Sequence, residues 1–339
     1  MTRGFGIVGA GMIAAIHADA IARLPDTRLI AVTDVAAGAA QAFAAGRGCA
    51  AEPSLDDLLA RRDVDVVCVC VPSGQHAEVG VRAAKAGKHL VIEKPLDVTL
   101  EAADRLLAAA REAGVALTVM SQHRFDPGVI ALKRLIDDGT LGRLVLGEAS
   151  TKWYRTQEYY DSAPWRGTWA MDGGALLNQG VHYVDLLRWC MGPVTEVTAV
   201  CTTQTHDIEV EDTALAVVRF ASGAVGTIGA TTAAFPGFPQ RLEITGTQGT
   251  VTVEDGQLVR AALRDAVAAA GSAGQAPSAA ADPGGLDAAI HAAQLADLLA
   301  AADEGREPAV SGQDGRDALE IVRAVYESSR TGRPVRIAP

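Results

Sequence analysis

Short apolar runs alternate with alanine-rich amphipathic stretches over residues 1–121. An apolar run of about four to eight residues between turn residues is typical of a buried strand, and a longer amphipathic stretch predicts a helix. The expected strands are Phe5–Val8, Leu29–Val32, Val64–Val71, His89–Ile92 and Ala116–Met120. The expected helices are Ile13–Arg23, Leu55–Arg61, Gln75–Ala86 and Leu100–Ala113. Because the strands are continuously apolar, the pattern predicts a doubly wound parallel sheet with helices on both faces.

The pattern changes after Gly142, where strand-like segments follow one another through short turns. Such an order predicts a largely antiparallel sheet. The expected strands are Val145–Tyr154, Val194–Thr205, Thr213–Phe220, Ala224–Thr232, Leu242–Thr245 and Thr250–Val253. Helices are expected at Ala175–Met191, Leu286–Ala302 and Gly315–Ser329.

Between the last strands and the last two helices lies Ala268–Gly285, which is rich in alanine, glycine, serine and proline. This composition predicts a mobile loop. We therefore expect an α/β chain of two domains, with the parallel sheet in residues 1–121 and an α+β domain in residues 122–339.

Composition and charge narrow the class of protein. The 339 residues are 49% hydrophobic, and the formal net charge of −11 argues against nucleic acid or an anionic membrane as the main partner. No apolar run reaches the roughly 20 residues that span a bilayer. The chain enters a strand-like pattern at once, which leaves no room for a signal peptide. Cys68 and Cys70 share one face of an apolar strand, which predicts buried free thiols in a cytoplasmic protein without a metal site.

A glycine-rich turn follows the first expected strand and opens a helix. The letters GAGMIA at residues 9–14 match G-x-G-x-x-G/A, with Ala14 in the third position. In this motif Gly9 permits the tight turn, and Gly11 lets backbone amides approach a pyrophosphate. Asp34 ends the second strand, where a carboxylate accepts hydrogen bonds from an adenosine ribose and repels a 2′-phosphate. We expect NAD rather than NADP as the cofactor; the alternative is a plain glycine turn with a solvated aspartate.

Two more strands end at the edge of the sheet where open α/β sheets bind ligands. One is followed by Pro72, Ser73 and His76. Ser73 suits a cofactor contact or a helix N-cap, and His76 suits a cofactor wall or a surface position. The other is followed by Glu93-Lys94-Pro95.

Lys94 has the chemistry that an alcohol oxidation requires. Moving a hydride from an alcohol carbon to nicotinamide demands removal of the hydroxyl proton. A lysine accepts that proton only if burial or cationic neighbours lower its pKa from about 10.4. Otherwise it acts as a cationic donor to the developing alkoxide. The alternative is a solvated charge at a strand tip.

The helix Ala175–Met191 carries a polar stripe of Asn178, His182 and Asp185 at positions i, i+4 and i+7. His182 titrates in the range of a general base, although an isolated histidine on such a helix is more often structural. All four tryptophans lie between residues 153 and 189. This aromatic cluster suits a hydroxylated ring such as a sugar; a small domain core or an oligomer interface is the alternative.

The segment Gln122-His123-Arg124 follows the apolar run Ala116–Met120 and is expected to face the active site. Arg124 can hold an anionic group bidentately, or it can form a structural salt bridge.

The fingerprint with Asp34, the letters AGKHLVIEKPL and the letters DGGALLNQGVHYVDLLRWCMG resemble the Gfo/Idh/MocA family of sugar and cyclitol dehydrogenases. The final SGQDGRDALEIVRAVYESSRTGRPVRI is similar to the family's closing segment. The resemblance covers nearly the whole chain. It implies a Rossmann domain, a second domain on a large open sheet, and homodimers or homotetramers that pack through that sheet.

The resemblance also assigns roles. Lys94 and His182 match the family's catalytic lysine and histidine, whereas many members have aspartate in place of Asn178. Asparagine at this position resembles some nucleotide-sugar 3-dehydrogenases. An amide cannot relay a proton, but it can bond a substrate hydroxyl.

The candidate site residues follow from these arguments. Catalytic roles are expected for Lys94, His182 and Asn178. Cofactor contacts are expected from Gly9, Gly11, Met12, Ile13, Asp34, Pro72, Ser73, His76, Glu93, Lys94 and Gln122. Substrate contacts are expected from Arg124, Tyr154, Trp165, Arg166 and His182.

Three functions are compatible with this set. The first is an NAD-dependent dehydrogenase that acts on a CH–OH group of a sugar, cyclitol or nucleotide sugar. The second is an NAD-dependent glycosidase, in which oxidation at one carbon activates elimination at another. The third is a non-catalytic NAD-binding sensor, which retention of Lys94 and His182 disfavours.

Overall fold

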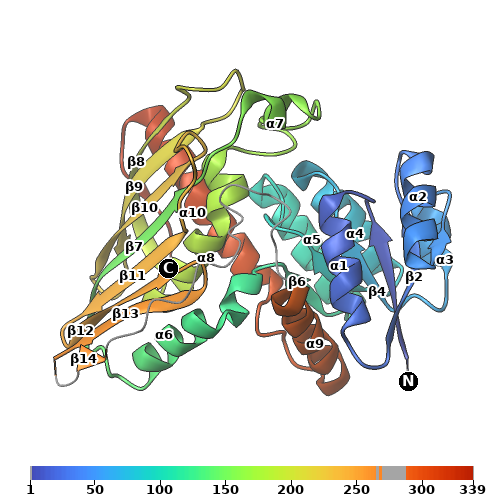
Figure 1. The fold of residues 1–339 in the computed structure, drawn as a ribbon, viewed down its shortest axis with the longest axis horizontal. Coiled ribbons are helices and arrows are strands. Elements are labelled where there is room, and N and C mark those ends of the chain that lie inside the picture. Colours follow the sequence, from blue (N-terminus) through green and yellow to red (C-terminus); the bar gives the residue numbers. More distant parts are fainter. Residues whose placement is uncertain (1, 265–266, 269–287, 339) are drawn as a thin grey trace. The chain divides into compact units, whose positions relative to one another are not determined.

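The computed structural model describes residues 2–264, 267–268 and 288–338. The chain forms two compact units, and their elements are labelled in Figure 1. Unit 1 combines Met1–Gln122 with Leu286–Arg316, and unit 2 combines His123–Gly285 with Asp317–Pro339. The expected loop Ala268–Gly285 lies outside the described residues except for its first position.

Unit 1 is built on six parallel strands in the order β3-β2-β1-β4-β5-β6. They are β1 (Arg3–Val8), β2 (Thr27–Thr33), β3 (Ala50–Ala51), β4 (Val66–Val69), β5 (His89–Ile92) and β6 (Leu117–Val119). This confirms the doubly wound parallel sheet. The strand order reverses between β1 and β4, and the carboxyl ends of strands at such a point are where ligands bind.

Helices cover both faces of this sheet. They are α1 (Met12–Ala22), α2 (Ala37–Arg47), α3 (Leu55–Ala60), α4 (His76–Lys85), α5 (Leu100–Ala113) and α9 (Ala288–Glu304), with the short 3₁₀ turn η1 (Ser73–Gln75). The residues of α1 and α9 share one apolar core with Phe5 and Ile7 of β1. On the opposite face, Gly80 of α4 lies against Leu106 of α5 and Ile92 of β5.

Two helices of unit 1 differ from the expectation. Helix α9 packs on α1 and buries Leu295 and Leu298 in the core of unit 1, whereas the division by sequence placed residues 122–339 in one domain. The apolar side of α9 packs against α1 and β1 of the parallel sheet. The position of α9 in the sequence does not predict this contact. Helix α2 was not expected, because it buries only the small side chains Ala40 and Ala44 and has little apolar contrast.

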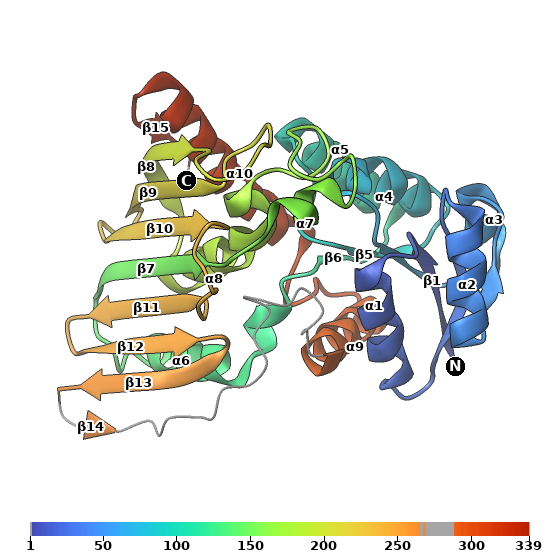
Figure 2. The ribbon, with the colours of Figure 1, turned by 45° about the horizontal axis from the view of Figure 1, so that its top comes forward.

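Unit 2 is built on nine strands in the order β14-β13-β12-β11-β7-β10-β9-β8-β15, which Figure 2 shows side by side. They are β7 (Leu144–Lys152), β8 (Val194–Thr202), β9 (Thr213–Phe220), β10 (Val225–Thr231), β11 (Arg241–Gly246), β12 (Gly249–Glu254), β13 (Gln257–Leu263), β14 (Val267–Ala268) and β15 (Val335–Arg336). Every neighbouring pair is antiparallel except β7 with β10. This confirms the large, mostly antiparallel sheet.

The two faces of this sheet differ. The remaining elements are η2 (Gln122–Phe125), α6 (Pro127–Asp137), α7 (Gln157–Asp161), η3 (Ala175–Gly180), α8 (Val181–Met191) and α10 (Gly312–Thr331). Helices α8 and α6 cover one face and pack on β7, β11, β12 and β13. The other face exposes Val200, Leu215 and Val217, which are 68%, 63% and 56% exposed. The alternation of buried and exposed residues along β9 follows from the period of two in a strand.

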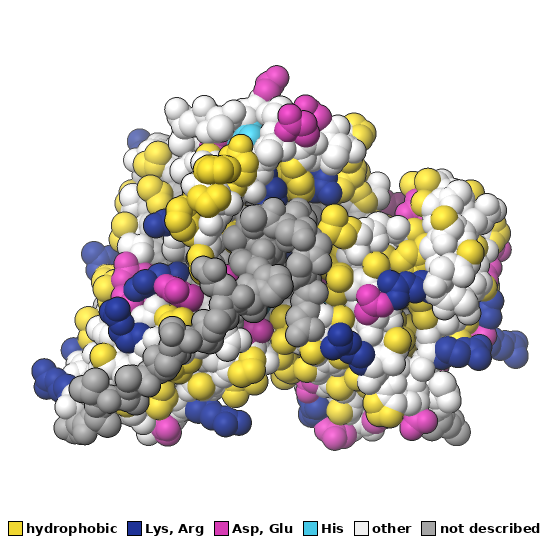
Figure 3. Space-filling view, in the orientation of Figure 1, with side chains coloured by type: hydrophobic (Ala, Val, Ile, Leu, Met, Phe, Trp, Pro, Cys, Tyr) yellow, Lys and Arg dark blue, Asp and Glu magenta, His cyan; other side chains and the backbone are white. Residues whose placement is uncertain are grey.

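Three further expectations concern the cysteines, the surface charges and membrane-spanning helices. Cys68 and Cys70 are buried free thiols, as expected. Lysine and arginine side chains lie among acidic and apolar ones on the face in Figure 3. Within the described ranges, no helix combines the length and the apolar character that crossing a membrane requires.

Candidate active site

The glycine turn after β1 has the geometry that a dinucleotide site requires. Gly9 has a φ of +96°, and a Cβ there would lie 2.5 Å from the carbonyl oxygen of Cys70. Only glycine tolerates both conditions. A Cβ at Gly11 would meet no atom within 4 Å, so the space beside the start of α1 is open.

The N-terminus of α1 is free to receive an anion. Gly11 is its N-cap and no side chain caps the helix, while Met12 in the first turn is 58% exposed. Uncapped N–H groups at the start of a helix attract phosphate. The residues here therefore fit the pyrophosphate of a dinucleotide.

Asp34 sits at the end of β2 beside this turn. Its Oδ2 accepts from the backbone N–H of Ala10 at 2.7 Å, and its Oδ1 accepts from Ala36 at 2.8 Å. Each carboxylate oxygen has more than one lone pair, so both remain available to a ribose diol. The carboxylate also places negative charge where NADP would carry its 2′-phosphate.

Among the residues after β4, His76 is enclosed by the protein. His76 is 1% exposed, and its Nδ1 and Nε2 lie 2.7 Å and 2.9 Å from the carbonyl oxygens of Pro95 and Val71. Burial lowers the pKa of His76, and the two hydrogen bonds oppose that effect. A neutral imidazole donates from one nitrogen only, so it bonds one of these two carbonyl oxygens at a time. Because His76 is buried, the surface alternative is wrong.

The other edge residues are also largely buried. Ser73 begins η1 and is buried, while Lys94 is half-buried. Gln122 is 3% exposed, and among the described residues its Oε1 has no hydrogen-bond partner. A buried acceptor without a donor fits the carboxamide of a nicotinamide, because unsatisfied buried polar groups are rare.

In unit 2, Arg124 and Asp185 form a buried bidentate ion pair. The Nε and Nη2 atoms of Arg124 lie 2.8 Å and 2.5 Å from the two carboxylate oxygens, and both side chains are at most 4% exposed. This geometry supports the structural salt bridge among the two roles expected for Arg124. It also explains the polar stripe that placed Asp185 beside His182.

The helix that carries Asn178 and His182 begins with a π-helical segment, η3, before α8. Sequence periodicity predicted one regular α-helix here. Asn178 lies in the π segment, and its amide nitrogen donates to Oδ1 of Asp172, which is 1% exposed. Oδ2 of Asp172 accepts from the backbone of Gly167 at 2.8 Å. A carboxylate only accepts, so the amide nitrogen of Asn178 faces Asp172.

His182 is 7% exposed and lies beside His123, a member of the segment Gln122-His123-Arg124 that was expected to face the active site. The ring centroids of His182 and His123 are 5.0 Å apart in an edge-to-face arrangement. Nδ1 of His123 in turn lies 2.7 Å from Oδ2 of Asp126. His182 therefore sits in a polar environment in which a proton-transfer role is chemically reasonable.

Glu211 caps the start of the same helix. Its Oε1 accepts from the backbone of Leu176 at 2.9 Å and from the hydroxyl of Tyr326 at 3.0 Å, and its carbonyl accepts from Ala175 at 2.9 Å. Burial raises the pKa of Glu211 to about 7, although these donors act in the opposite direction. A Cβ at Gly174 would collide with this carboxyl group, so a larger residue there would displace it.

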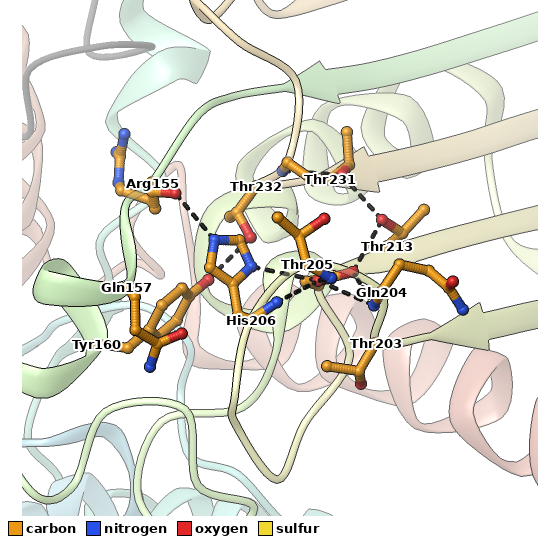
Figure 4. Close-up of polar contacts among 12 residues, drawn as sticks. Arg155, Gln157, Tyr160, Thr203, Gln204, Thr205, His206, Thr213, Thr231 and Thr232 are labelled. Atoms are coloured by element: carbon orange, nitrogen blue, oxygen red, sulfur yellow. Dashed lines mark hydrogen bonds and ion pairs between the residues drawn. The ribbon is translucent and has the colours of Figure 1, made fainter.

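The loop before Glu211 is held by Asp212, which is fully buried. Its Oδ2 accepts from the backbones of Thr205 at 2.7 Å and of Gln204 and His206 at 3.1 Å and 3.2 Å. Figure 4 shows the hydrogen bonds of these three loop residues converging, and Nε2 of His206 also lies 2.9 Å from the carbonyl oxygen of Arg155. These hydrogen bonds fix the loop that positions Glu211 at the start of the helix.

The aromatic residues separate into different environments. Arg166 stacks on Tyr159 and Trp165, with its guanidinium carbon 4.3 Å and 4.6 Å from their ring centroids. Its Nη1 donates to the hydroxyl of Tyr159 at 2.7 Å. In the part of the chain that the structure describes, no carboxylate pairs with Arg166, and its buried Nε has no hydrogen-bond partner. Tyr154 packs edge-to-face on Phe235 at 5.2 Å.

Comparison with known proteins agrees with both units. Residues 3–121 match the model of an oxidoreductase family with an NAD-binding Rossmann fold, and residues 129–252 match the GFO/IDH/MocA C-terminal domain. The chain is 30% identical to inositol 2-dehydrogenase of Rhizobium meliloti over all of both chains. It is 29% identical to myo-inositol 2-dehydrogenase of Thermotoga maritima over 98% of both.

A solved structure extends the comparison. The WlbA dehydrogenase of Bordetella pertussis, in complex with NADH and UDP-GlcNAcA, is 33% identical over all of both chains, with a TM-score of 0.89.

The position of Asp34 yields a prediction about cofactor choice. Asp34→Ser removes the charge that disfavours a 2′-phosphate. We expect the ratio of kcat/KM with NAD to kcat/KM with NADP to fall by about tenfold or more, which steady-state kinetics would measure. Asp34→Asn removes the same charge but keeps the size and an acceptor for Ala10, so the ratio should fall in this variant too if the charge is responsible. A preference for NADP in the unsubstituted protein would overturn the assignment.

The burial of Glu211 yields a prediction about stability. Its pKa is raised in the folded state, so the folded state binds the proton more tightly and the carboxyl group costs stability as pH rises from about 5 to 8. Glu211→Gln keeps the acceptor for Leu176 without the charge. Its free energy of unfolding should improve relative to the unsubstituted protein over that range, by on the order of 2 kcal/mol. Denaturation by urea at several pH values measures this.

Glu209→Gln is the control, since that carboxylate is exposed two residues away. Its difference from the unsubstituted protein should stay nearly constant. A pH-independent difference for Glu211→Gln would show that this group does not titrate in the range.

Proposed function

Because the chain belongs to the GFO/IDH/MocA family of NAD-binding oxidoreductases, we propose that it oxidises a secondary hydroxyl of a nucleotide sugar that carries an acidic group. The cofactor is NAD, and the reaction class is hydride transfer at a CH–OH carbon of a sugar, cyclitol or nucleotide sugar. The acidic nucleotide sugar is the finer part of the proposal. The contacts of Arg166 carry it.

Arg166 has the properties of an anion-binding side chain. Its guanidinium is fixed by stacking on Tyr159 and Trp165, its Nε is buried without a partner, and no described carboxylate neutralises it. A planar guanidinium binds carboxylates and phosphates bidentately. The similarity to a dehydrogenase in complex with UDP-GlcNAcA, a nucleotide-sugar acid, supports the same substrate class.

Each catalytic residue has a role that its environment permits. NAD, when bound, accepts the hydride, so the hydroxyl proton must pass to a protein base. Lys94 on the strand-end turn and His182 on α8 are the two candidate bases. Asn178 donates from its amide nitrogen to Asp172, and the carbonyl oxygen of an asparagine can accept from a substrate hydroxyl.

The exposed face of the nine-stranded sheet supports a homo-oligomer. Val200, Leu215 and Val217 lie on the outward face of β8 and β9 and are each more than half exposed. Apolar residues that gather in this way on a strand face mark protein interfaces. A second copy of the chain is the partner that the family resemblance implies.

The substrate class can be tested directly. We expect NADH production, followed at the reduced-nicotinamide absorbance band, with UDP-linked sugar acids and little with myo-inositol or neutral sugars. Arg166→Gln should raise KM for the acidic substrate by about tenfold or more, because a charge-assisted bidentate contact is lost, and should leave KM for NAD unchanged. The exposed Arg134→Gln is the matched control.

Other outcomes select other functions. Efficient turnover of neutral polyols, insensitive to Arg166→Gln, would contradict the acidic substrate. Product formation without net NADH would indicate the glycosidase.

The proton acceptor gives another prediction. Lys94→Ala should lower kcat by roughly a hundredfold or more, the usual scale for general acid–base catalysis, with NAD affinity nearly unchanged. His182→Asn should also remove most activity. In the oxidative direction, kcat/KM should rise with pH through an apparent pKa that belongs to the base. An unimpaired kcat in either variant would remove that residue from the mechanism.

A further inference from the structure

A group of ionisable side chains lies inside unit 1, behind the turn that carries Lys94. His17 of α1 is completely buried, and its Nε2 lies 2.7 Å from Oε1 of Glu93, which is 6% exposed. His291 of α9 is 1% exposed and packs edge-to-face on His17, with centroids 5.7 Å apart. The thiols of Cys68 on β4 and of Cys70, which directly follows β4, are further neighbours of His17. We name these five residues the His17 cluster.

The cluster connects to the main chain of Lys94. The second carboxylate oxygen of Glu93, Oε2, accepts from the backbone N–H of Lys94 at 3.2 Å. One carboxylate therefore bonds both the imidazole of His17 and the peptide group of the candidate base. On the other side of the same turn, His76 bonds to the carbonyl oxygen of Pro95.

The charges of the cluster follow from its surroundings. Burial alone would raise the pKa of Glu93, but the hydrogen bond and charge of His17, with the charges of His291 and Lys94, lower it to about 2. Burial alone would lower the pKa of His17, but Cys70, Cys68 and Glu93 raise it well above its ordinary value. Burial raises the pKa of Cys70 to about 11, so near pH 7 it is a neutral thiol and contributes no charge. The carboxylate of Glu93, 2.7 Å from Nε2, is therefore the charged partner of His17.

A buried ion pair needs a reason other than stability, because the desolvation of two charges offsets much of their attraction. A pair of apolar side chains would fill the same space without the free-energy cost of removing two charges from water. Here the pair fixes a negative charge one residue from Lys94 and orients its peptide group. An adjacent anion favours the ammonium form of a lysine and thereby sets its proton affinity.

We propose that His17 is a positioning residue for Lys94, acting through Glu93. It keeps Glu93 ionised, and Glu93 holds the Lys94 turn in place and tunes the lysine's proton affinity. The catalytic consequence rests on the proposed function, whereas the contacts among His17, Glu93 and Lys94 all lie within unit 1. It also ties α1, whose first turn fits the cofactor pyrophosphate, to the turn of the candidate base.

The test uses three variants of the full chain: His17→Gln, Glu93→Gln and the double variant. His17→Gln removes the positive partner, so burial favours the protonated form of Glu93. Glu93→Gln keeps an acceptor for the Lys94 amide and removes only the charge. His89→Gln is the control, since His89 is partly exposed at the opposite end of β5.

The first readout does not depend on activity. Acetylation of the Lys94 amine at a series of pH values, followed by peptide mass spectrometry, gives its pKa in the protein without substrate. We expect the pKa of Lys94 to fall by about one unit in all three variants and to stay constant in the control. An unchanged lysine pKa in Glu93→Gln and the double variant would overturn the proposal.

The second readout separates positioning from simple structural support. Removing one partner of a buried ion pair destabilises a protein, whereas replacing both is often neutral. The thermal midpoint should therefore drop in the single variants and recover in the double variant. A lysine with a lower pKa loses its proton at lower pH, so the rising limb of the kcat/KM pH profile should move to lower pH in all three variants. Return of that limb to its original position in the double variant would show a purely structural pair. A lowered lysine pKa without a shift of the limb would instead refute the proposed role of Lys94 and leave the positioning intact.

Discussion

A carboxylate removed from water must meet several donors inside the protein, because its hydration is worth far more than one ordinary hydrogen bond. The segments that carry the candidate chemistry are held by carboxylates of this kind. Glu93 fastens the Lys94 turn, Asp172 fastens Asn178, and Asp185 fastens the short turn at Arg124. Glu211 and Asp212 hold the start of the helix that carries His182. Loops that lack a regular ladder thereby gain fixed positions.

The same constraint has two electrostatic outcomes. Glu93 faces a histidine, and its pKa falls to about 2 despite burial. Glu211 accepts from peptide N–H groups and a tyrosine hydroxyl, its buried Oε2 has no hydrogen-bond partner among the described residues, and its pKa rises to about 7. Neutral donors thus do not compensate the charge of a buried carboxyl group. The Lys94 turn is held by a permanent charge, while the His182 helix is held by a group that titrates near neutrality.

The parallel sheet was predictable because its strands are continuous apolar runs that end in Gly9, Asp34 and Lys94 at one edge. Candidate bases were found on the same principle. The partners that position them were not predictable, since Glu93 and His17 lie 76 positions apart and no periodicity links them. The domain of α9 and the π segment at Asn178 depend on tertiary packing, which outweighs local pattern. The position of Asp172 six residues before Asn178 could have indicated this contact from the sequence.

Because Asp172 and Asn178 are in contact, the residue that is tolerated at one position depends on the residue at the other. The family resemblance implies that many members have aspartate at position 178, and a single exchange of Asn178 to aspartate in this sequence would set two carboxylates against each other. They would have to share a proton. A prior exchange at position 172 to a side chain that donates would remove the conflict. The order of the two exchanges therefore determines whether position 178 can become aspartate in this sequence without placing two carboxylates in contact.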